Sequence, residues 1–289
     1  MWQDFEVAVP GKWVLAGEHA VLRGATAIAL PHPDAFLTLR FQAGGGEFTV
    51  SPGSAKAVLN DLLHSVRDKW ENQDKSFPWP KGSLSLESSI PLGAGLGSSA
   101  ALCVAVTRWL APVLNLKEND FFEFARSLEH QFHGQSSGMD IAVALARQPI
   151  AYGVEKGAHS LVLRKLPRFT FHDTGLRSRT SDSIMKVLEI KSKFPILSME
   201  IDQKMGALTG KLLQGLQLYS DRQDKDGQER AVRDWIAPNM NAAHSCFVDW
   251  GLVPSQITAQ REELFEKGAV GVKLTGAGDG GFLVALWEG

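Results

Sequence analysis

Three glycine-rich stretches carry the residues whose types and spacing could handle phosphate. They are Pro10-Gly11-Lys12, Gly93-Ala94-Gly95-Leu96-Gly97-Ser98-Ser99 and Gly276-Ala277-Gly278-Asp279-Gly280-Gly281. Glycine lets the backbone approach a ligand closely and turn its N–H groups toward anionic oxygens. A single such loop serves a turn as often as a ligand. Three of them, with an acidic cluster between the second and the third, favour a nucleotide-dependent phosphotransferase.

The middle stretch gives the strongest signal because it lies between an expected strand at 83–89 and an apolar helix expected over 100–114. That context places the N–H groups of a first helical turn and the positive end of the helix dipole at the loop, where they can bind an anion. The hydroxyls of Ser98 and Ser99 could add ligands for phosphate or Mg²⁺. The plainer alternative is that one of these serines only caps the helix.

Two other nucleotide-binding motifs that contain glycine do not fit this sequence. The nearest approach to a P-loop, at 206–212, is one residue short and lacks a Ser or Thr after its lysine. The third stretch has the GxGxxG spacing of a dinucleotide-binding loop. It precedes a strand-like run, however, and leaves no room for the acidic residue expected about 20 positions further on.

Two carboxylates lie between the second and third stretches. Glu129 is expected near the end of a helix, and Asp140 follows a turn rich in Gly and Ser. One of them could hold a cation while the other faces a substrate hydroxyl. Taken alone, a solvated Glu and an Asp that caps a helix is the simpler interpretation. His130 and His133 lack the HExxH arrangement, so a zinc site is not favoured.

A GxSxG pattern at 134–138, centred on Ser136, keeps a hydrolase open as a rival. A nucleophile elbow lies on a turn from strand to helix, whereas a helix is expected before this pattern. A rival of another kind is a degenerate protein that binds nucleotide without catalysis.

The composition of the 289 residues limits the partners. A net charge of −2 with 21% charged residues provides no basic field for nucleic acid or an acidic membrane. No run approaches the roughly 18 apolar residues of a membrane span, and no secretory signal is evident at the N-terminus. Cys103 and Cys246 are expected to be reduced structural thiols. We therefore expect a cytoplasmic protein whose partner is a small molecule.

The hydrophobic pattern predicts both strands and helices, and hence an α+β or mixed architecture. Pro10-Gly11 is expected to end a strand at 5–9, and 47–50 to return as a hairpin partner; 141–146 fits a helix or a strand equally well. A polar loop is expected at 70–82. Further strands are expected at 13–15, 27–30, 36–41, 161–166, 169–172, 270–275 and 282–287, and further helices at 56–69, 120–133, 181–193, 197–220, 228–249 and 254–267.

Taken together, these motifs resemble those of the GHMP kinases along almost the whole chain. The segment 10–24 is similar to the PGKxxLxGEHAVxxG opening of the mevalonate kinase family, and 91–100 to the PxGAGLGSSA loop that binds ATP. The segments 133–140 and 273–278 resemble the HGxPSGxD and KLTGAG motifs. Asp173-Thr174-Gly175 with Thr180 is similar to a segment that supplies a threonine to the site.

The resemblance implies two domains, 1–165 and 166–289. The first would be like ribosomal protein S5 domain 2 and the second ferredoxin-like, with the site in the cleft between them. It also implies transfer of the γ-phosphoryl group of ATP to the primary hydroxyl of mevalonate. Another acceptor, such as phosphomevalonate, homoserine or a sugar, is the alternative. Family members are often homodimers.

Matching positions give each residue an implied role. Asp140 would be the catalytic base, and Lys12 would stabilise charge at the reacting hydroxyl. Ser99 and Glu129 would hold Mg²⁺. The acceptor would be contacted by Glu18, His19, Thr180 and Ala277, and ATP by Gly93, Ala94, Gly95, Leu96, Gly97, Ser98, Ser99, Gly276 and Gly278.

Three departures from the family pattern carry expectations of their own. Asp279 replaces a glycine, which puts a carboxylate near phosphate unless it points away or meets a cation. Ser136 replaces a proline, which predicts a less rigid turn before Asp140. The loop at 70–82 is similar to a shortened lid on the adenine side.

Overall fold

The protein is described from a computed structural model that covers residues 2–72, 76–133 and 136–288. Its contacts divide the chain into two units. Unit 1 comprises residues 1–11, 32–91 and 97–147, and unit 2 comprises 12–31, 92–96 and 148–289. Each unit therefore combines segments that are far apart in the sequence. The division at 165/166 separates consecutive segments instead, and it stays a prediction.

Two long strands run through both units. They are β1 (Phe5–Ala16) and β2 (Ala27–Ala43), and they pair with each other. The expected end of the first strand at Pro10-Gly11 is wrong, because β1 continues to Ala16. Among the described strands β1 pairs with β2 alone, so it has an edge on which proline removes no ladder hydrogen bond.

In unit 1, the segment 37–43 of β2 pairs antiparallel with β4 (Gly82–Ser88). The strand β3 (Thr49–Ser51) pairs parallel with β4, and between them lie the 3₁₀ helix η2 (Gly53–Ala55) and α1 (Lys56–Glu71). The predicted hairpin at 47–50 is therefore wrong. The helix after β3 acts as the crossover that parallel strands require. Of the loop expected at 70–82, residues 73–75 lie outside the described residues.

The helices of unit 1 include one that is almost wholly apolar. This is α2 (Ser98–Leu114), which packs with α3 (Phe121–His133) and α4 (Met139–Ala146); the 3₁₀ helix η3 (Glu118–Asp120) precedes α3. The segment whose type the periodicity left open is thus helical. Trp109 of α2 is 2% exposed, and its ring lies 5.1 Å from Phe41 and 5.0 Å from Trp2. This aromatic cluster fixes α2 within unit 1.

In unit 2, residues 27–29 of β2 pair antiparallel with β5 (Ile150–Gly153), which forms a hairpin with β6 (Gly157–Ser160). No strand forms at 161–166, contrary to expectation. Val162 is 85% exposed, and the Arg164 N–H donates to the Ser220 hydroxyl at 2.8 Å instead of joining a ladder.

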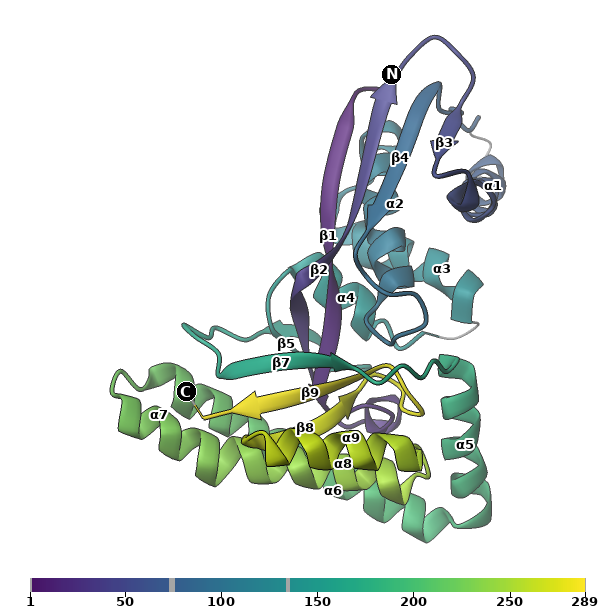
Figure 1. The fold of residues 1–289 in the computed structure, drawn as a ribbon. Helices are drawn as coiled ribbons and strands as arrows, with labels where there is room; N and C mark the ends of the chain where they lie inside the picture. Colours follow the sequence, from purple (N-terminus) through teal and green to yellow (C-terminus); the bar gives the residue numbers. More distant parts are fainter. Residues whose placement is uncertain (1, 73–75, 134–135, 289) are drawn as a thin grey trace. The chain divides into compact units, whose positions relative to one another are not determined.

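A second sheet of unit 2 has the antiparallel order β7-β9-β8, and α8 and α9 pack against β8 (Figure 1). Trp13 of β1 contacts this sheet through Phe169, with ring centroids 4.9 Å apart. The helix expected over 228–249 is divided by a π-helix. The elements of unit 2 not yet given have these bounds: η1 (Ala20–Arg23), β7 (Arg168–Asp173), α5 (Thr180–Lys193), α6 (Pro195–Asp221), α7 (Lys225–Ala231), η4 (Val232–Ile236), α8 (Ala237–Asp249), α9 (Ser255–Glu266), β8 (Ala269–Thr275) and β9 (Phe282–Trp287).

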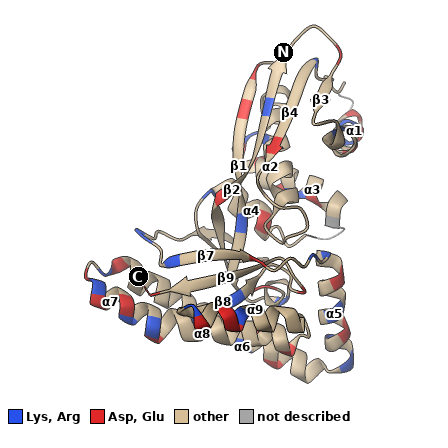
Figure 2. Cartoon of the chain, in the orientation of Figure 1, with Lys and Arg blue, Asp and Glu red and all other residues tan. Residues whose placement is uncertain are grey.

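Charge is mixed along the helices of unit 2. Basic and acidic residues are both present on α5 and α7, as Figure 2 shows, in keeping with the net charge of −2. Within the described ranges, no helix combines the length and apolar character needed to cross a bilayer. Both cysteines are buried and free, and burial raises the pKa of the Cys246 thiol to about 11.

Candidate active site

Parts of the three glycine-rich stretches meet within unit 2, namely Lys12 of the first, residues 93–96 of the second and the whole of the third. The Lys12 N–H of the first donates to the Leu96 carbonyl of the second at 2.9 Å. The residues next to the first and third stretches are also joined: the Val14 N–H donates to Thr275 Oγ1 at 2.7 Å, and that hydroxyl donates to the Val14 carbonyl at 3.1 Å. Segments more than 170 residues apart therefore share one local structure, as the motifs predicted.

Glycine is required where the second and third stretches touch. A Cβ on Gly276 would lie 3.2 Å from Gly95 Cα, and a Cβ on Gly281 would lie 2.5 Å from the Ala94 carbonyl oxygen. Gly276 and Gly281 also have φ values of 88° and 83°, in the left-handed region that favours glycine. The close contact between the two backbones thus explains why both sequences are rich in glycine.

The second stretch leads into α2. Gly93, Gly95 and Gly97 have φ values of 67°, 73° and 76°. Gly97 is the N-cap of α2 and provides no capping side chain, so the alternative that Ser98 or Ser99 serves as the cap is wrong. Residues 93–96 belong to unit 2 and 97–99 to unit 1. A glycine-capped helix N-terminus of this kind suits an anion.

Three polar side chains of the segment 12–19 are buried in unit 2. Lys12, Glu18 and His19 are only 5%, 4% and 7% exposed. Glu18 accepts a short hydrogen bond from Lys273 Nζ of β8. Burial raises the pKa of Glu18 above its ordinary value, opposed by the charges of Lys273 and Lys12, and it lowers the pKa of Lys273. This set is a compact polar cluster in an apolar setting.

His19 connects the segment 12–19 to the third stretch. Its Nε2 lies 2.8 Å from the Ala277 carbonyl oxygen, which can only accept, so Nε2 carries the hydrogen. Burial lowers the pKa of His19 to about 4, which keeps the ring neutral at pH 7. A φ of 58° places this residue in a backbone region that non-glycine residues rarely adopt. Strain of this kind is concentrated at functional sites.

Asp279, which departs from the family pattern, meets a cation. Its Oδ1 lies 2.7 Å from Lys186 Nζ of α5, and its Oδ2 accepts from the Ser183 hydroxyl at 3.2 Å. The added negative charge of the third stretch is therefore compensated by a lysine from the same unit.

Thr180 does not join this cluster. It is the exposed first residue of α5, and among the described residues it makes no hydrogen bond to the third stretch. Its neighbours Ser178 and Ser183 do, donating to the Gly278 carbonyl at 2.8 Å and 3.5 Å. Its predicted contact with the acceptor stays a prediction.

Glu129 and Asp140 belong to unit 1, on α3 and α4, which pack against each other. Glu129 is 2% exposed. Asp140 is the second residue of α4 and Gly138 is the N-cap, so Asp140 is not the cap of its helix. An acidic side chain in the first turn is stabilised by the helix dipole.

Ser136, in the position of the family's proline, orients this region. Its hydroxyl donates to Glu129 Oε2 at 2.5 Å and accepts from the Gly138 N–H at 3.0 Å. Hydrogen bonds therefore hold the turn in place of a proline ring. Gly134 and Gln135 of the GxSxG pattern lie outside the described residues. Because α3 precedes the pattern where a nucleophile elbow needs a strand, the hydrolase interpretation does not fit.

The chemistry of the predicted metal ligands fits Mg²⁺. Ser99 and Glu129 offer a hydroxyl and a carboxylate from α2 and α3, which pack together in unit 1. Mg²⁺ prefers oxygen ligands and is usually held by one or two protein groups together with phosphate and water. Across the described ranges, no group of three or more His, Cys, Asp and Glu could form a metal cage.

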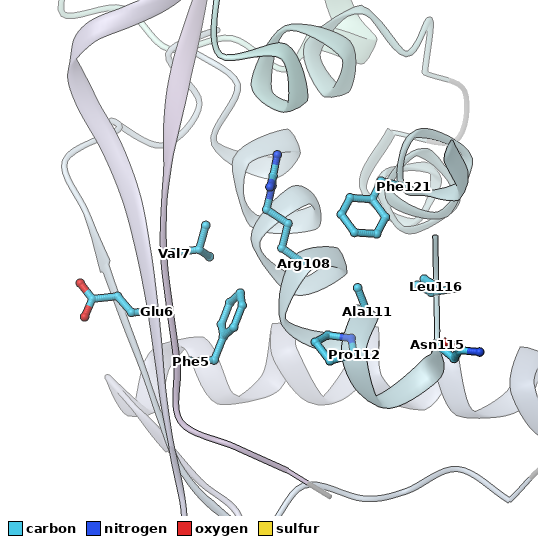
Figure 3. Close-up of a pocket in the computed structure, with 9 residues that line it drawn as sticks. All are labelled: Phe5, Glu6, Val7, Arg108, Ala111, Pro112, Asn115, Leu116 and Phe121. Carbon is cyan, nitrogen blue, oxygen red and sulfur yellow. The ribbon is translucent and has the colours of Figure 1, made fainter. Parts of the chain in front are cut away.

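Unit 1 has a cavity of about 470 Å³ (Figure 3). Its walls come from the start of β1, the end of α2 and the start of α3. Phe5 and Val7 point into it and Glu6 points away. None of the predicted site residues lines it.

Some residues of the site were not predicted. Lys273 and Thr275 stand inside the KLTGAG-like segment, yet a motif read as a phosphate loop gives no reason to pair its lysine with Glu18, 255 positions away. Alternation along 270–275 places Lys273 on the face opposite to Val270, Val272 and Leu274, so no pattern in the sequence indicates that this lysine is buried. Charged residues at buried positions are unusual.

Comparisons with known proteins agree with this geometry. The family described as "GHMP kinases N terminal domain" matches residues 57–148. A mevalonate kinase of Pyrococcus abyssi is 27% identical over 98% of this chain and 88% of its own length. The crystal structure of L. major mevalonate kinase in complex with R-mevalonate has a TM-score of 0.78 at 22% identity, covering 100% of this chain and 89% of that one.

The fold is shared more widely. Streptococcus pneumoniae phosphomevalonate kinase has a TM-score of 0.74 at 16% identity, covering 99% of this chain and 92% of that one. Fold alone therefore does not distinguish acceptors. The α+β fold is thus shared with kinases of known structure, residues 57–148 match the GHMP kinase N-terminal domain, and nearly the whole chain is similar to proteins named mevalonate kinase.

Proposed function

We propose that this protein transfers the γ-phosphoryl group of ATP to the primary hydroxyl of mevalonate. The observation that carries the proposal is the junction of the segment 12–19 with both other glycine stretches, through Lys12 to Leu96 and His19 to Ala277. Buried polar side chains for an acceptor thus lie beside backbone suited to phosphate. Near-full-length relatives are named mevalonate kinase, which favours mevalonate over the other acceptors.

ATP phosphates bind the backbone of residues 93–99, Gly276 and Gly278. Left-handed glycines let successive N–H groups face one anion, as in other phosphate-binding concavities. The first turn of α2 adds the positive end of its dipole. Phosphoryl transfer depends mainly on such positioning and charge neutralisation, and much less on covalent help from the protein.

The acceptor binds through Glu18, His19, Ala277 and Thr180. Lys12 stabilises negative charge as the hydroxyl oxygen attacks the γ-phosphorus, and Asp140 accepts the hydroxyl proton. The new bond joins that oxygen to phosphorus, the bond from phosphorus to the β–γ bridging oxygen breaks, and ADP leaves. Ser99 and Glu129 hold Mg²⁺, which neutralises charge on the phosphate oxygens when bound.

A coupled assay of ADP release tests the acceptor. Purified protein with ATP and Mg²⁺ is given mevalonate, phosphomevalonate, homoserine or galactose. We expect kcat/KM for mevalonate to exceed each other value by at least about tenfold, since unmatched polar groups in a site strongly disfavour wrong substrates. A higher value for another compound would transfer the proposal to that acceptor. Nucleotide binding without turnover of any compound would support the non-catalytic alternative.

Three further expectations stay predictions: the cleft between domains as the place of the site, a homodimer, and a cytoplasmic location. Light scattering of the purified protein distinguishes a monomer of 31.5 kDa from a dimer.

A further inference from the structure

Lys273 is a buried cation that the roles assigned above leave without a function. It lies on β8 in unit 2 and is 1% exposed. Its Nζ donates to Glu18 Oε1 and to the Leu274 carbonyl, the latter at 2.5 Å, and it lies 4.8 Å from the centroid of the Phe247 ring. Burial of a charge is costly unless hydrogen bonds surround it. These contacts hold the ammonium group in one position.

The second oxygen of Glu18 has no such partner. Glu18 Oε2 is buried and, among the described residues, accepts no hydrogen bond. A buried acceptor that loses water without gaining a donor destabilises the folded protein, and natural structures keep few of them. Oε1 is committed to Lys273, so Oε2 is the atom of the carboxylate left for a ligand.

The surroundings of this oxygen match the proposed acceptor site. Lys12 lies close enough to act on the charge of Glu18, and the adjacent His19 reaches the third glycine stretch through Ala277. The ammonium group of Lys12 and the neutral ring of His19 therefore lie in the same buried segment as this oxygen. Such a cluster suits a small acid that also bears a hydroxyl.

We propose that Lys273 is a positioning residue of the acceptor site, which holds Glu18 so that Oε2 accepts a hydrogen bond from a hydroxyl of the acceptor. The inference rests on the proposed function and deepens it. Lys273 acts through Glu18 and touches neither ATP nor the reacting hydroxyl. Its loss therefore affects acceptor binding more than nucleotide binding.

Variants at both positions test the inference. We expect Lys273→Met and Glu18→Gln each to raise KM for mevalonate roughly 10- to 100-fold, the effect of losing one hydrogen bond to a charged group. KM for ATP should stay within about threefold. The double variant should resemble either single variant, because both changes remove the same interaction. Lys204→Met is the matched control, since Lys204 is a half-exposed lysine of unit 2 paired with Asp249.

The stability of the variants distinguishes a positioning role of Lys273 from a purely structural role. Lys273→Met leaves Glu18 buried without its cation, so its urea midpoint should fall, and the double variant should recover much of that loss. If the double variant recovers the KM for mevalonate as well, Lys273 is only structural and the inference is overturned. If Lys273→Met does not fold, the double variant and Glu18→Gln still show whether the KM for mevalonate depends on this pair.

The wild-type assay distinguishes the two proposals. Wild-type turnover of mevalonate with an unchanged KM in the variants overturns the inference and leaves the proposed function intact. Turnover of another acceptor overturns mevalonate as substrate, and the same KM comparison with that acceptor then tests Lys273. A wild-type protein that binds ATP and phosphorylates nothing overturns both.

Discussion

Asp140 is the side chain on which the proposed proton transfer depends. Asp140→Asn keeps its size and its place in the first turn of α4, but it removes the carboxylate that accepts a proton. We expect kcat to fall about 10²- to 10⁴-fold, the usual contribution of a general base. Affinity for ATP, measured by calorimetry, should remain within about twofold. Asp61→Asn, on the exposed face of α1, is the control. Wild-type kcat in Asp140→Asn would remove the assigned role.

His19 makes the stability of the protein depend on pH. Burial is the main cause that lowers its pKa from 6.5 to about 4, and Arg23 and Lys273 act in the same direction. Between pH 6.5 and pH 4 the unfolded chain therefore binds a proton that the folded chain does not. The free energy of unfolding is complete above pH 6.5 and falls as the pH decreases toward 4.

The expected loss for His19 alone is on the order of 2–3 kcal/mol. Urea denaturation at pH 7 and pH 4.5 measures it. His19→Gln keeps a donor for the Ala277 carbonyl and cannot titrate, so its loss between these two pH values should be smaller than that of wild type. His159→Gln, at an exposed position of β6, should behave like wild type. An identical loss in His19→Gln would show that other groups cause the pH dependence.

At the scale of elements, α5 and the third glycine stretch are joined by the pair Lys186 and Asp279. The side chain of Asp279 is only 11% exposed and that of Lys186 50% exposed. Lys186→Met leaves the carboxylate uncompensated near the proposed phosphate position. Because a pair this exposed is worth at most about 1 kcal/mol, KM for ATP should rise about two- to fivefold.

Asp279→Asn on the Lys186→Met background should reverse that rise. Asn tolerates the left-handed backbone of this position, where φ is 60°, and it carries no charge. Steady-state kinetics at varied ATP and saturating acceptor measures both variants. If the double variant keeps the raised KM, repulsion by Asp279 is not the cause.

Sequence alone predicted most elements because their apolar spacing is regular, as in α2 and α3. It failed where a distant partner decides the conformation. Pro10 would end a strand in isolation, yet β1 has an edge where proline costs no hydrogen bond. The run at 161–166 has the composition of a strand, but Ser220 and Pro149 take backbone hydrogen bonds that a neighbouring strand would otherwise take. Local pattern does not contain such information.

The residues of the candidate site also fall into those that the sequence indicates and those that it does not. Glycine stretches can be recognised in the sequence because close backbone contact excludes other residues, as at Gly281 against the Ala94 carbonyl. The partner of a buried charged residue cannot be recognised from the sequence in this way. Glu18 and Lys273 are ordinary charged residues in the sequence, and only the folded chain shows that one holds the other.

For the whole molecule, the discontinuous units predict which fragments can fold. Residues 166–289 form most of unit 2, but that unit also needs 12–31, 92–96 and 148–165. Without them, Phe169 and Phe171 lose their contacts with Trp13, and Lys273 loses Glu18. A buried lysine without its carboxylate is strongly destabilising. We therefore expect the fragment 166–289 to show no cooperative unfolding in urea.

The complementary fragment supplies the control. Residues 1–165 contain every missing part of unit 2, so mixing the two fragments should restore a cooperative transition and near-ultraviolet circular dichroism. The fragment 166–289 alone should lack both signals, whereas 1–165 contains all of unit 1, so its own signals are measured separately and subtracted from those of the mixture. If 166–289 alone unfolds cooperatively, with the denaturant dependence expected for its length, then the sequence-based division at residue 165 describes an independent folding domain. The contacts of the segment 12–31 would in that case contribute to the site and not to the stability of the C-terminal part.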